Sequence, residues 1–154
     1  MPEVKLTEDC MRLISQFESL TGAGSRDCVI DERNGRLIFV VNPGDMGLAI
    51  GKKGASIKKA SEVMGKKIEV VEYNSNPEQF IKNCFLPAQV VGMKFEGEPE
   101  QQTVTVDIRD DDRGIAIGKE GKNIFKAKKL ALRQHNIADI QILQKPDAVA
   151  GPDL

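Results

Sequence analysis

The sequence contains no tryptophan, one tyrosine and a single histidine, His135. Its three cysteines, Cys10, Cys28 and Cys84, are odd in number and far apart, so they fit neither a disulfide framework nor a CxxC metal site. We expect them to be buried free thiols. No cysteine or carboxylate pair lies close to His135 in the sequence, so the chain offers no candidate catalytic residue. We therefore expect a protein that is not an enzyme and that needs neither a metal nor a cofactor.

Long apolar runs and a secretion signal are also missing. No stretch approaches the roughly 20 apolar residues that are needed to cross a bilayer. Residues 1–5 lack the basic-then-apolar pattern of a signal peptide. We expect a cytoplasmic protein with no membrane partner and no small-molecule substrate.

An overall basic charge is absent as well, because 22 lysines and arginines face 23 acidic residues. The basic residues are nevertheless concentrated in two places. Residues 50–67 contain six lysines and one acidic residue, and residues 113–133 contain seven basic residues and one acidic residue. One lysine-rich helix face is explained by solubility alone. Two such segments in the same sequence context favour surfaces that bind anions.

That shared context is an internal repeat with an offset of 67 residues. Residues 45–60 read DMGLAIGKKGASIKKA, and residues 112–127 read DRGIAIGKEGKNIFKA. Ten of the sixteen aligned positions are identical, without a gap. The chain therefore contains a duplicated structural unit.

The same succession of elements is expected around each copy, from apolar periodicity and from turn and capping residues. In the first copy the expected elements are a helix between a Thr7 N-cap and a Gly22 stop, strands over 28–32 and 36–41, a helix over 46–50 capped by Asp45, a second helix ended by Gly65, and a strand over 67–73. In the second copy they are a helix over 78–85, strands over 89–95 and 103–108, a helix–loop–helix capped by Asp111 or Asp112, and a strand over 137–143.

Both copies read α–β–β–α–α–β, which predicts two tandem α+β domains, each with helices packed on one face of a three-stranded sheet. We expect a first domain over 1–73, a linker over 74–76, a second domain over 77–143 and a disordered tail over 144–154. Because a three-residue linker is too short for a flexible tether, the two small domains are expected to pack together.

Each repeat also contains a loop with a glycine at both ends, Gly51-Lys52-Lys53-Gly54 and Gly118-Lys119-Glu120-Gly121. Glycine adopts backbone angles that other residues avoid, and it removes side chains that would hold a ligand away. A helix begins directly after each loop, so its free N–H groups and the positive end of its dipole favour a phosphate. The spacing does not match a mononucleotide P-loop, because the residue after the lysine is Lys53 or Glu120 instead of serine or threonine. No GxGxxG fingerprint for dinucleotides is present either.

Glycines at these positions could also serve only a tight turn between two helices. The combination of each loop with isoleucines on both sides, found twice, is more specific than that. It resembles the core motif of KH domains, an apolar residue followed by I-G-x-x-G, two residues and isoleucine. The order of elements is similar to the type II, or prokaryotic, KH arrangement.

The resemblance implies that each GxxG loop clamps the backbone of about four nucleotides of single-stranded RNA, with the isoleucines as an apolar floor under the bases. The RNA-binding residues that it implies are Ile50, Gly51, Lys52, Lys53, Gly54, Ile57, Ile117, Gly118, Lys119, Glu120, Gly121, Lys122, Ile124 and Lys126. Glu120 repels phosphate and is expected to weaken the second clamp. A basic stripe of Lys122, Lys126, Lys129 and Arg133 on one helix face is expected to compensate.

At the level of the whole chain, residues up to about Leu143 resemble the KH pair of the NusA-like transcription factors, particularly their short archaeal forms. The implied function is regulation of transcription elongation or termination, with RNA polymerase as a further candidate partner. The alternative is a role in ribosome assembly or RNA processing, in which KH pairs also occur. The run Asp110-Asp111-Asp112 could suggest a metal site, but capping of the following helix explains it more simply.

Overall fold

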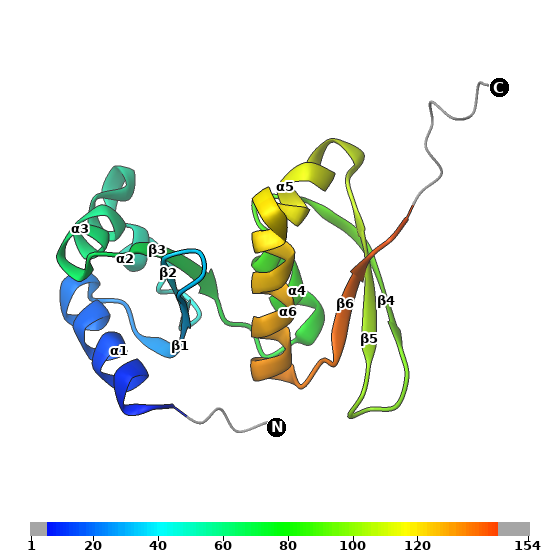
Figure 1. Ribbon diagram of the computed structural model, residues 1–154, viewed down its shortest axis with the longest axis horizontal. Coiled ribbons are helices and arrows are strands. Elements are labelled where there is room, and N and C mark those ends of the chain that lie inside the picture. Colours follow the sequence, from blue (N-terminus) through cyan, green and yellow to red (C-terminus); the bar gives the residue numbers. More distant parts are fainter. Residues whose placement is uncertain (1–5, 145–154) are drawn as a thin grey trace. The chain divides into compact units, whose positions relative to one another are not determined.

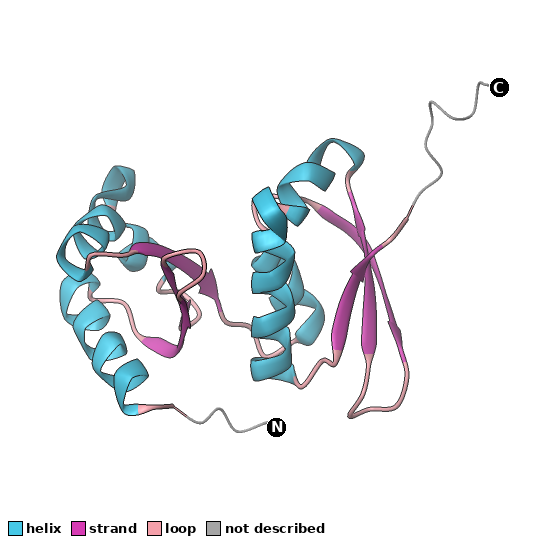
Figure 2. Ribbon diagram, viewed as in Figure 1, coloured by secondary structure: helices cyan, strands magenta, loops and turns pink. Residues whose placement is uncertain are grey.

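The computed structural model describes residues 6–144, and the chain divides into two compact units, residues 1–84 and 85–154. Each unit contains a three-stranded sheet together with helices, as Figure 1 shows. Figure 2 separates the helices from the strands by colour. The α+β prediction is confirmed, because each unit combines helices with a sheet of three strands.

The first unit has the predicted order of elements. They are α1 (Glu8–Thr21), β1 (Ser25–Asp31), β2 (Arg36–Val41), α2 (Met46–Ile50), a 3-10 turn (Lys52–Gly54), α3 (Ala55–Met64) and β3 (Lys67–Glu72). The strand order is β1-β2-β3, with β1 antiparallel and β3 parallel to β2. The parallel pair requires a crossover, and α2 and α3 provide it.

The ends of α1 follow from local chemistry. Thr7 is extended, and its Oγ1 accepts a hydrogen bond from the N–H of Cys10 at 3.1 Å. At the other end Gly22 has a φ of 80° and donates its N–H to the carbonyl of Glu18. Both predicted signals are confirmed.

The core of the first unit lies between its sheet and its helices. The rings of Phe17 on α1 and Phe39 on β2 stack with their centroids 4.1 Å apart. Ala49 on α2 and Ala60 on α3 are fully buried, and such small side chains let the helices approach the core closely. Packing of this kind fixes the position of the loop that joins α2 to α3.

The second unit repeats this architecture. Its elements are β4 (Val90–Glu96), β5 (Thr103–Ile108), a 3-10 turn (Asp110–Asp112), α5 (Arg113–Ile117), a second 3-10 turn (Lys119–Gly121), α6 (Lys122–His135) and β6 (Asp139–Ile142), with the strand order β4-β5-β6. Burial alternates along β5, where Val104, Val106 and Ile108 are fully buried and the residues between them are half-buried. Helix α6 has 14 residues against 10 in α3.

Helix α4 (Pro77–Phe85) lies where the two units divide, between Cys84 and Phe85. Asn76 precedes it and accepts a hydrogen bond from the N–H of Gln79 at 3.1 Å. Within the first unit, the ring of Phe80 lies against that of Tyr73, with centroids 5.8 Å apart. The domain boundary at 74–76 stays a prediction. Of the expected tail, all but residue 144 lies outside the described residues.

Asp45 and Asp112 do not cap the helices that follow them, so that prediction was wrong. Neither makes a side-chain cap hydrogen bond, and both have a ψ near zero, whereas an N-cap is typically extended. Instead the Oδ2 of Asp45 accepts from the N–H of Gly24 at 2.8 Å, and that of Asp112 from the N–H of Gln89 at 2.9 Å. Each carboxylate thus ties a short helix to the residue before the first strand of its unit.

Candidate nucleic-acid interface

The two glycine loops have closely matching backbones. Gly51 has φ 76° and ψ 172°, and Gly118 has φ 78° and ψ 168°. The last two residues of each loop are left-handed, with a φ of 54° at Lys53 and 57° at Glu120, each followed by a glycine. Three of the four residues in each loop therefore have positive φ, which orders a sharp turn between the two helices.

Glycine is required at the first position of each loop for two reasons. The combination of angles is essentially restricted to glycine, and space is lacking as well. A Cβ on Gly51 would lie 2.7 Å from the backbone nitrogen of Ser56, and a Cβ on Gly118 would lie 2.9 Å from that of Asn123. The loop is therefore pressed against the first turn of the following helix.

The last glycine of each loop is needed only for its backbone angle. A Cβ on Gly54 or Gly121 would meet only the Cγ2 of Ile57 or Ile124, at 3.9 and 3.8 Å. Matching hydrogen bonds close both loops: the N–H of Gly54 donates to the carbonyl of Gly51, and that of Gly121 to the carbonyl of Gly118, each at 3.1 Å.

The side chains between the glycines point to solvent. Lys52 and Lys53 are exposed, and so are Lys119 and Glu120. None of the four forms an ion pair with another residue in the described range. The first loop therefore presents two ammonium groups, whereas the second presents one ammonium and one carboxylate.

Apolar side chains lie next to both loops. Ile50 and Ile117, each directly before a loop, are exposed large hydrophobic residues, as are Leu48 and Ile115 two positions earlier. Ile57 and Ile124 are half-buried. Exposed apolar atoms beside cationic side chains suit a ligand that has both a flat apolar part and an anionic backbone.

The predicted basic stripe on α6 is not a continuous exposed face. Lys126 is only 8% exposed, and it lies on the buried side of the helix with Ala127 and Leu130. Lys122 and Arg133 are half-buried, and Lys129 is exposed. Because Lys126 exposes so little of its surface, we give it no part in the proposed interface, and the other predicted residues stay candidates.

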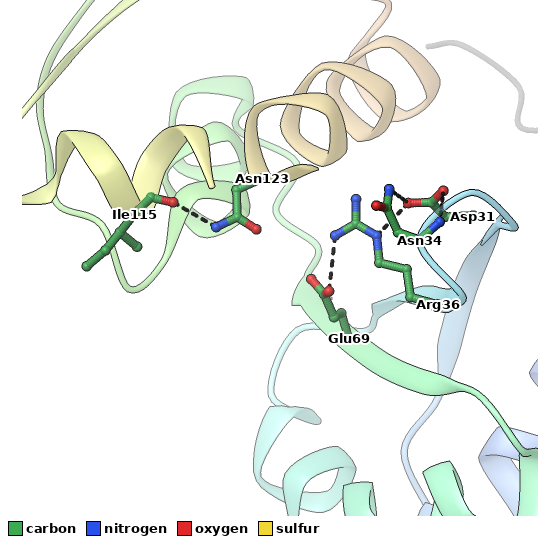
Figure 3. Close-up of polar contacts among 6 residues, drawn as sticks. All are labelled: Asp31, Asn34, Arg36, Glu69, Ile115 and Asn123. Atoms are coloured by element: carbon green, nitrogen blue, oxygen red, sulfur yellow. Dashed lines mark hydrogen bonds and ion pairs between the residues drawn. The ribbon is translucent and has the colours of Figure 1, made fainter. Parts of the chain in front are cut away.

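Two residues near the second loop escaped the sequence analysis. Asn123 donates its Nδ2–H to the carbonyl of Ile115 at 2.7 Å and so ties the first turn of α6 to α5 (Figure 3). Phe125 lies one turn into α6 and is exposed. Both replace a different residue of the first repeat, Ser56 and Lys58, and that difference was the only signal in the sequence.

Figure 3 also shows a charged cluster in the sheet of the first unit. The buried guanidinium of Arg36 contacts Asp31, with Nε 2.6 Å from Oδ2, and Glu69, with Nη1 3.0 Å from Oε2. Burial alone would raise the pKa of Asp31, but hydrogen bonds from Asn34 and Arg36 outweigh it and hold that pKa below its usual value. The cluster joins all three strands of the first sheet, because Asp31 lies on β1, Arg36 on β2 and Glu69 on β3.

Other kinds of site find little support. Among residues 6–144, no group of three or more histidine, cysteine or acidic side chains is close enough to hold a metal ion. The three cysteines are buried free thiols, as predicted. In the part of the chain that the structure describes, no helix has the length and apolar character to cross a membrane.

Each of the two repeats matches a known protein family. Residues 13–76 match the family described as "KH domain", and residues 77–145 match the family described as "NusA-like second KH domain". The two matches together cover the elements that carry both glycine loops.

Curated relatives and a solved structure extend over most of the chain. A "Probable transcription termination protein NusA" of Methanococcus vannielii is 39% identical over 137 residues, which cover 89% of this chain and 78% of that protein. The protein of the same name in Halobacterium salinarum is 34% identical over 139 residues, which cover 90% of this chain and 98% of that protein. The crystal structure of APE1850 is similar with a TM-score of 0.81 and 38% sequence identity, over 90% of this chain and 100% of that one.

Proposed function

The chain belongs to the family of NusA-like transcription termination proteins built on KH domains, and on that premise we propose that it binds single-stranded RNA through its two glycine loops. The observation that carries the proposal is the pair of loops with one backbone conformation, exposed cationic side chains and exposed isoleucines. In each loop the first glycine lets the strand approach the backbone closely, and the lysines neutralise phosphates.

A single strand suits this surface better than a duplex. The isoleucines beside the loops can contact bases only where those bases are not paired and stacked within a helix. The role is binding without catalysis, exerted on nascent RNA during transcription elongation or termination. RNA polymerase is the protein partner that such a role requires near the transcript.

The test is a pair of variants with equal charge change. Lys52→Asp/Lys53→Asp reverses the charge of the first loop, and aspartate tolerates the left-handed angle at position 53. Lys66→Asp/Lys67→Asp makes the same change between the end of α3 and the start of β3, where both lysines are also exposed. Filter binding to a ten-nucleotide single strand should show a loss of about tenfold or more for the loop variant, since each charge-assisted contact contributes more than a kcal/mol, and a much smaller loss for the control.

Circular dichroism on both variants checks that they fold. Equal losses in the two variants would show a nonspecific charge effect, and an unchanged affinity in the loop variant would exclude the clamp. If about five phosphates are neutralised, the plot of log affinity against log salt should have a slope of about −3 to −4 for a single strand. Tighter binding to a duplex of the same sequence would contradict the proposal.

A further inference from the structure

One aromatic side chain of the second unit is left uncovered. Phe125 on α6 is 48% exposed, whereas Phe17, Phe39, Phe80 and Phe85 are at most 2% exposed. A phenylalanine in water forgoes the free energy that its burial would contribute. Its place beside a candidate binding loop makes it a candidate contact for the ligand of that loop.

Phe125 lines a hollow of about 210 Å³ between the exposed side of α6 and the start of β6. The other lining residues are Lys128, Lys129, Leu132, Ala138 and Asp139. Pockets for whole drug-sized ligands measure roughly 300–1,000 Å³. This shallow hollow is smaller, and it suits one flat ring lying against Phe125 and Leu132.

The charges around the ring favour an anionic chain. Lys129 is exposed and forms no ion pair with any residue in the described part of the chain. The ammonium of Lys128 lies 3.3 Å from a carboxylate oxygen of Asp139, so it is directed toward the edge of the hollow. An aromatic ring with lysines beside it is the combination by which proteins hold single-stranded nucleic acids, through a stacked base and a neutralised phosphate.

The position of the ring agrees with such a strand. Phe125 follows Gly121 by four residues, which is about 6 Å along the helix axis. A strand whose backbone lies at the Gly118–Gly121 loop therefore has a base within reach of the ring. In the first repeat Lys58 occupies the position of Phe125, and Lys53 that of Glu120. The second unit thus has less attraction for phosphate and, in its place, a surface for a base.

We propose that Phe125 is a stacking platform for one unpaired base of the RNA strand bound at the second loop. The inference rests on the proposed RNA binding and adds a base contact, and hence a source of base preference, that the loops themselves do not supply. Purines stack over a larger area than pyrimidines, so a purine is the preferred occupant.

The absence of tryptophan from the sequence gives a direct assay. Phe125→Trp introduces a single tryptophan at the ring, and a ten-nucleotide single strand should quench its fluorescence strongly on binding. Val91→Trp is the matched control, because Val91 is 62% exposed in the same unit but lies on β4. Its fluorescence should change little.

Affinity provides the second measurement. Phe125→Ala should weaken binding of the ten-nucleotide strand about tenfold, within the range for loss of one stacked base. Phe125→Leu, which keeps an apolar side chain without the ring, should recover only part of the loss. Neither variant should change the salt slope, because no phosphate contact is removed. A strand of the same length that lacks its bases should bind the parent and Phe125→Ala equally.

The outcomes separate the two proposals. Suppose that the parent binds the strand and that Lys52→Asp/Lys53→Asp weakens this binding. If the fluorescence of Phe125→Trp is then not quenched and the affinity of Phe125→Ala equals that of the parent, the stacking platform is wrong and the loop clamp stands. Equal quenching of the Val91→Trp control, or equal weakening toward the strand without bases, likewise overturns stacking. If the parent binds no single-stranded RNA, both proposals fall, and a protein partner for Phe125 becomes the better hypothesis.

Discussion

At the two glycine loops the backbone angles agree within a few degrees, while half of the exposed side chains differ. The φ values of the first glycines are 76° and 78°, and both loops are closed by the same hydrogen bond at 3.1 Å. Yet Lys53 corresponds to Glu120 and Lys58 to Phe125. The residues that the turn itself requires, two glycines and a buried alanine on each side, are the same in both copies. The two positions that differ are exposed ones, whereas the lysine after the first glycine and the isoleucines beside each loop are shared.

The sheets differ in a similar way. In the first unit Arg36, the first residue of the middle strand β2, is buried between Asp31 and Glu69. In the second unit the first residue of the middle strand β5 is Thr103, which is half-buried and uncharged. One unit therefore depends on a buried ion cluster at a place where its copy does not, and that contrast can be tested.

The largest effect is expected from removing the arginine. Arg36→Met keeps much of the volume but leaves two carboxylates beside each other without their cation, which should destabilise the first unit by about 3–5 kcal/mol. Thr103→Val at the matching position should change the stability by less than about 1 kcal/mol. Urea unfolding, with hydrogen exchange of the β1–β3 amides, measures both. Similar effects at the two positions would show that the sheets do not differ in this respect.

Acid should reveal the same contrast. The pKa of Asp31 is lowered in the folded protein, so its charge contributes stability above the pKa of about 3.9 that the group has when unfolded. That contribution is lost as the pH falls through the lower, folded pKa. Asp31→Asn should therefore be less stable than the parent at pH 7 and show a flatter decline below about pH 4. An unchanged acid profile would contradict the role given to Asp31.

Alanine at the first glycine of each loop should have the next largest effect, and the same effect in both units. Gly51→Ala and Gly118→Ala each force a Cβ against the following helix and cost about 1–3 kcal/mol. Gly54→Ala and Gly121→Ala have space for the Cβ and meet only the left-handed angle, at about 1 kcal/mol. Urea unfolding of the four variants tests whether equivalent glycines of the two loops lose the same free energy of unfolding. A cost at Gly118 far below that at Gly51 would break the equivalence of the two loops.

Exchanging the charges of the loops should have a smaller effect, on RNA affinity alone. Glu120→Lys gives the second loop the charge of the first and should tighten binding about fivefold, with a salt slope steeper by about 0.7. Lys53→Glu should do the reverse. Filter binding at several salt concentrations measures both quantities. If Glu120→Lys leaves the slope unchanged, the second loop does not contact phosphate.

The features that the sequence predicted correctly depend on neighbours in the chain. The ends of α1 follow from Thr7 and Gly22, and the order of the elements follows from periodicity and from the repeat. The partners of Asp45 and Asp112 could not be predicted, because the residues they bind lie 21 and 23 positions earlier and only the folded chain brings them together.

The exposure of residues on α6 could not be predicted from the sequence either, for a related reason. A spacing of four, three and four residues places Lys122, Lys126, Lys129 and Arg133 on the same side of a helix, but it does not say whether that side meets solvent. The structure buries Lys126 and exposes Phe125, the reverse of what their chemistry alone suggests. Which side of α6 is exposed depends on the elements that pack against the helix, and the spacing of residues within the helix does not give that information.

The smallest effect is expected at Asn123, and it tests whether the matching loops are also equally rigid. Its Nδ2–H donates to the carbonyl of Ile115 at 2.7 Å, across the junction of α5 and α6 and near the surface. Asn123→Ser installs the residue that the first repeat has at Ser56 and removes this bond, so it should cost about 0.5–1 kcal/mol.

Since the glycine angles are set by the backbone, the second loop should keep its conformation in this variant. Its amides should nevertheless exchange faster with solvent, because one tie between the two helices is gone, and RNA affinity should fall by less than about twofold. Hydrogen exchange at residues 118–121, with the same loop of the parent and residues 51–54 of the variant as references, measures the difference. The reciprocal Ser56→Asn change should leave the first unit at least as stable, because the amide can reach the carbonyl of Leu48 as Asn123 reaches that of Ile115. If exchange in the second loop is unaffected by the loss of Asn123, the backbone alone holds both loops, and the side chains that differ between them serve the ligand only.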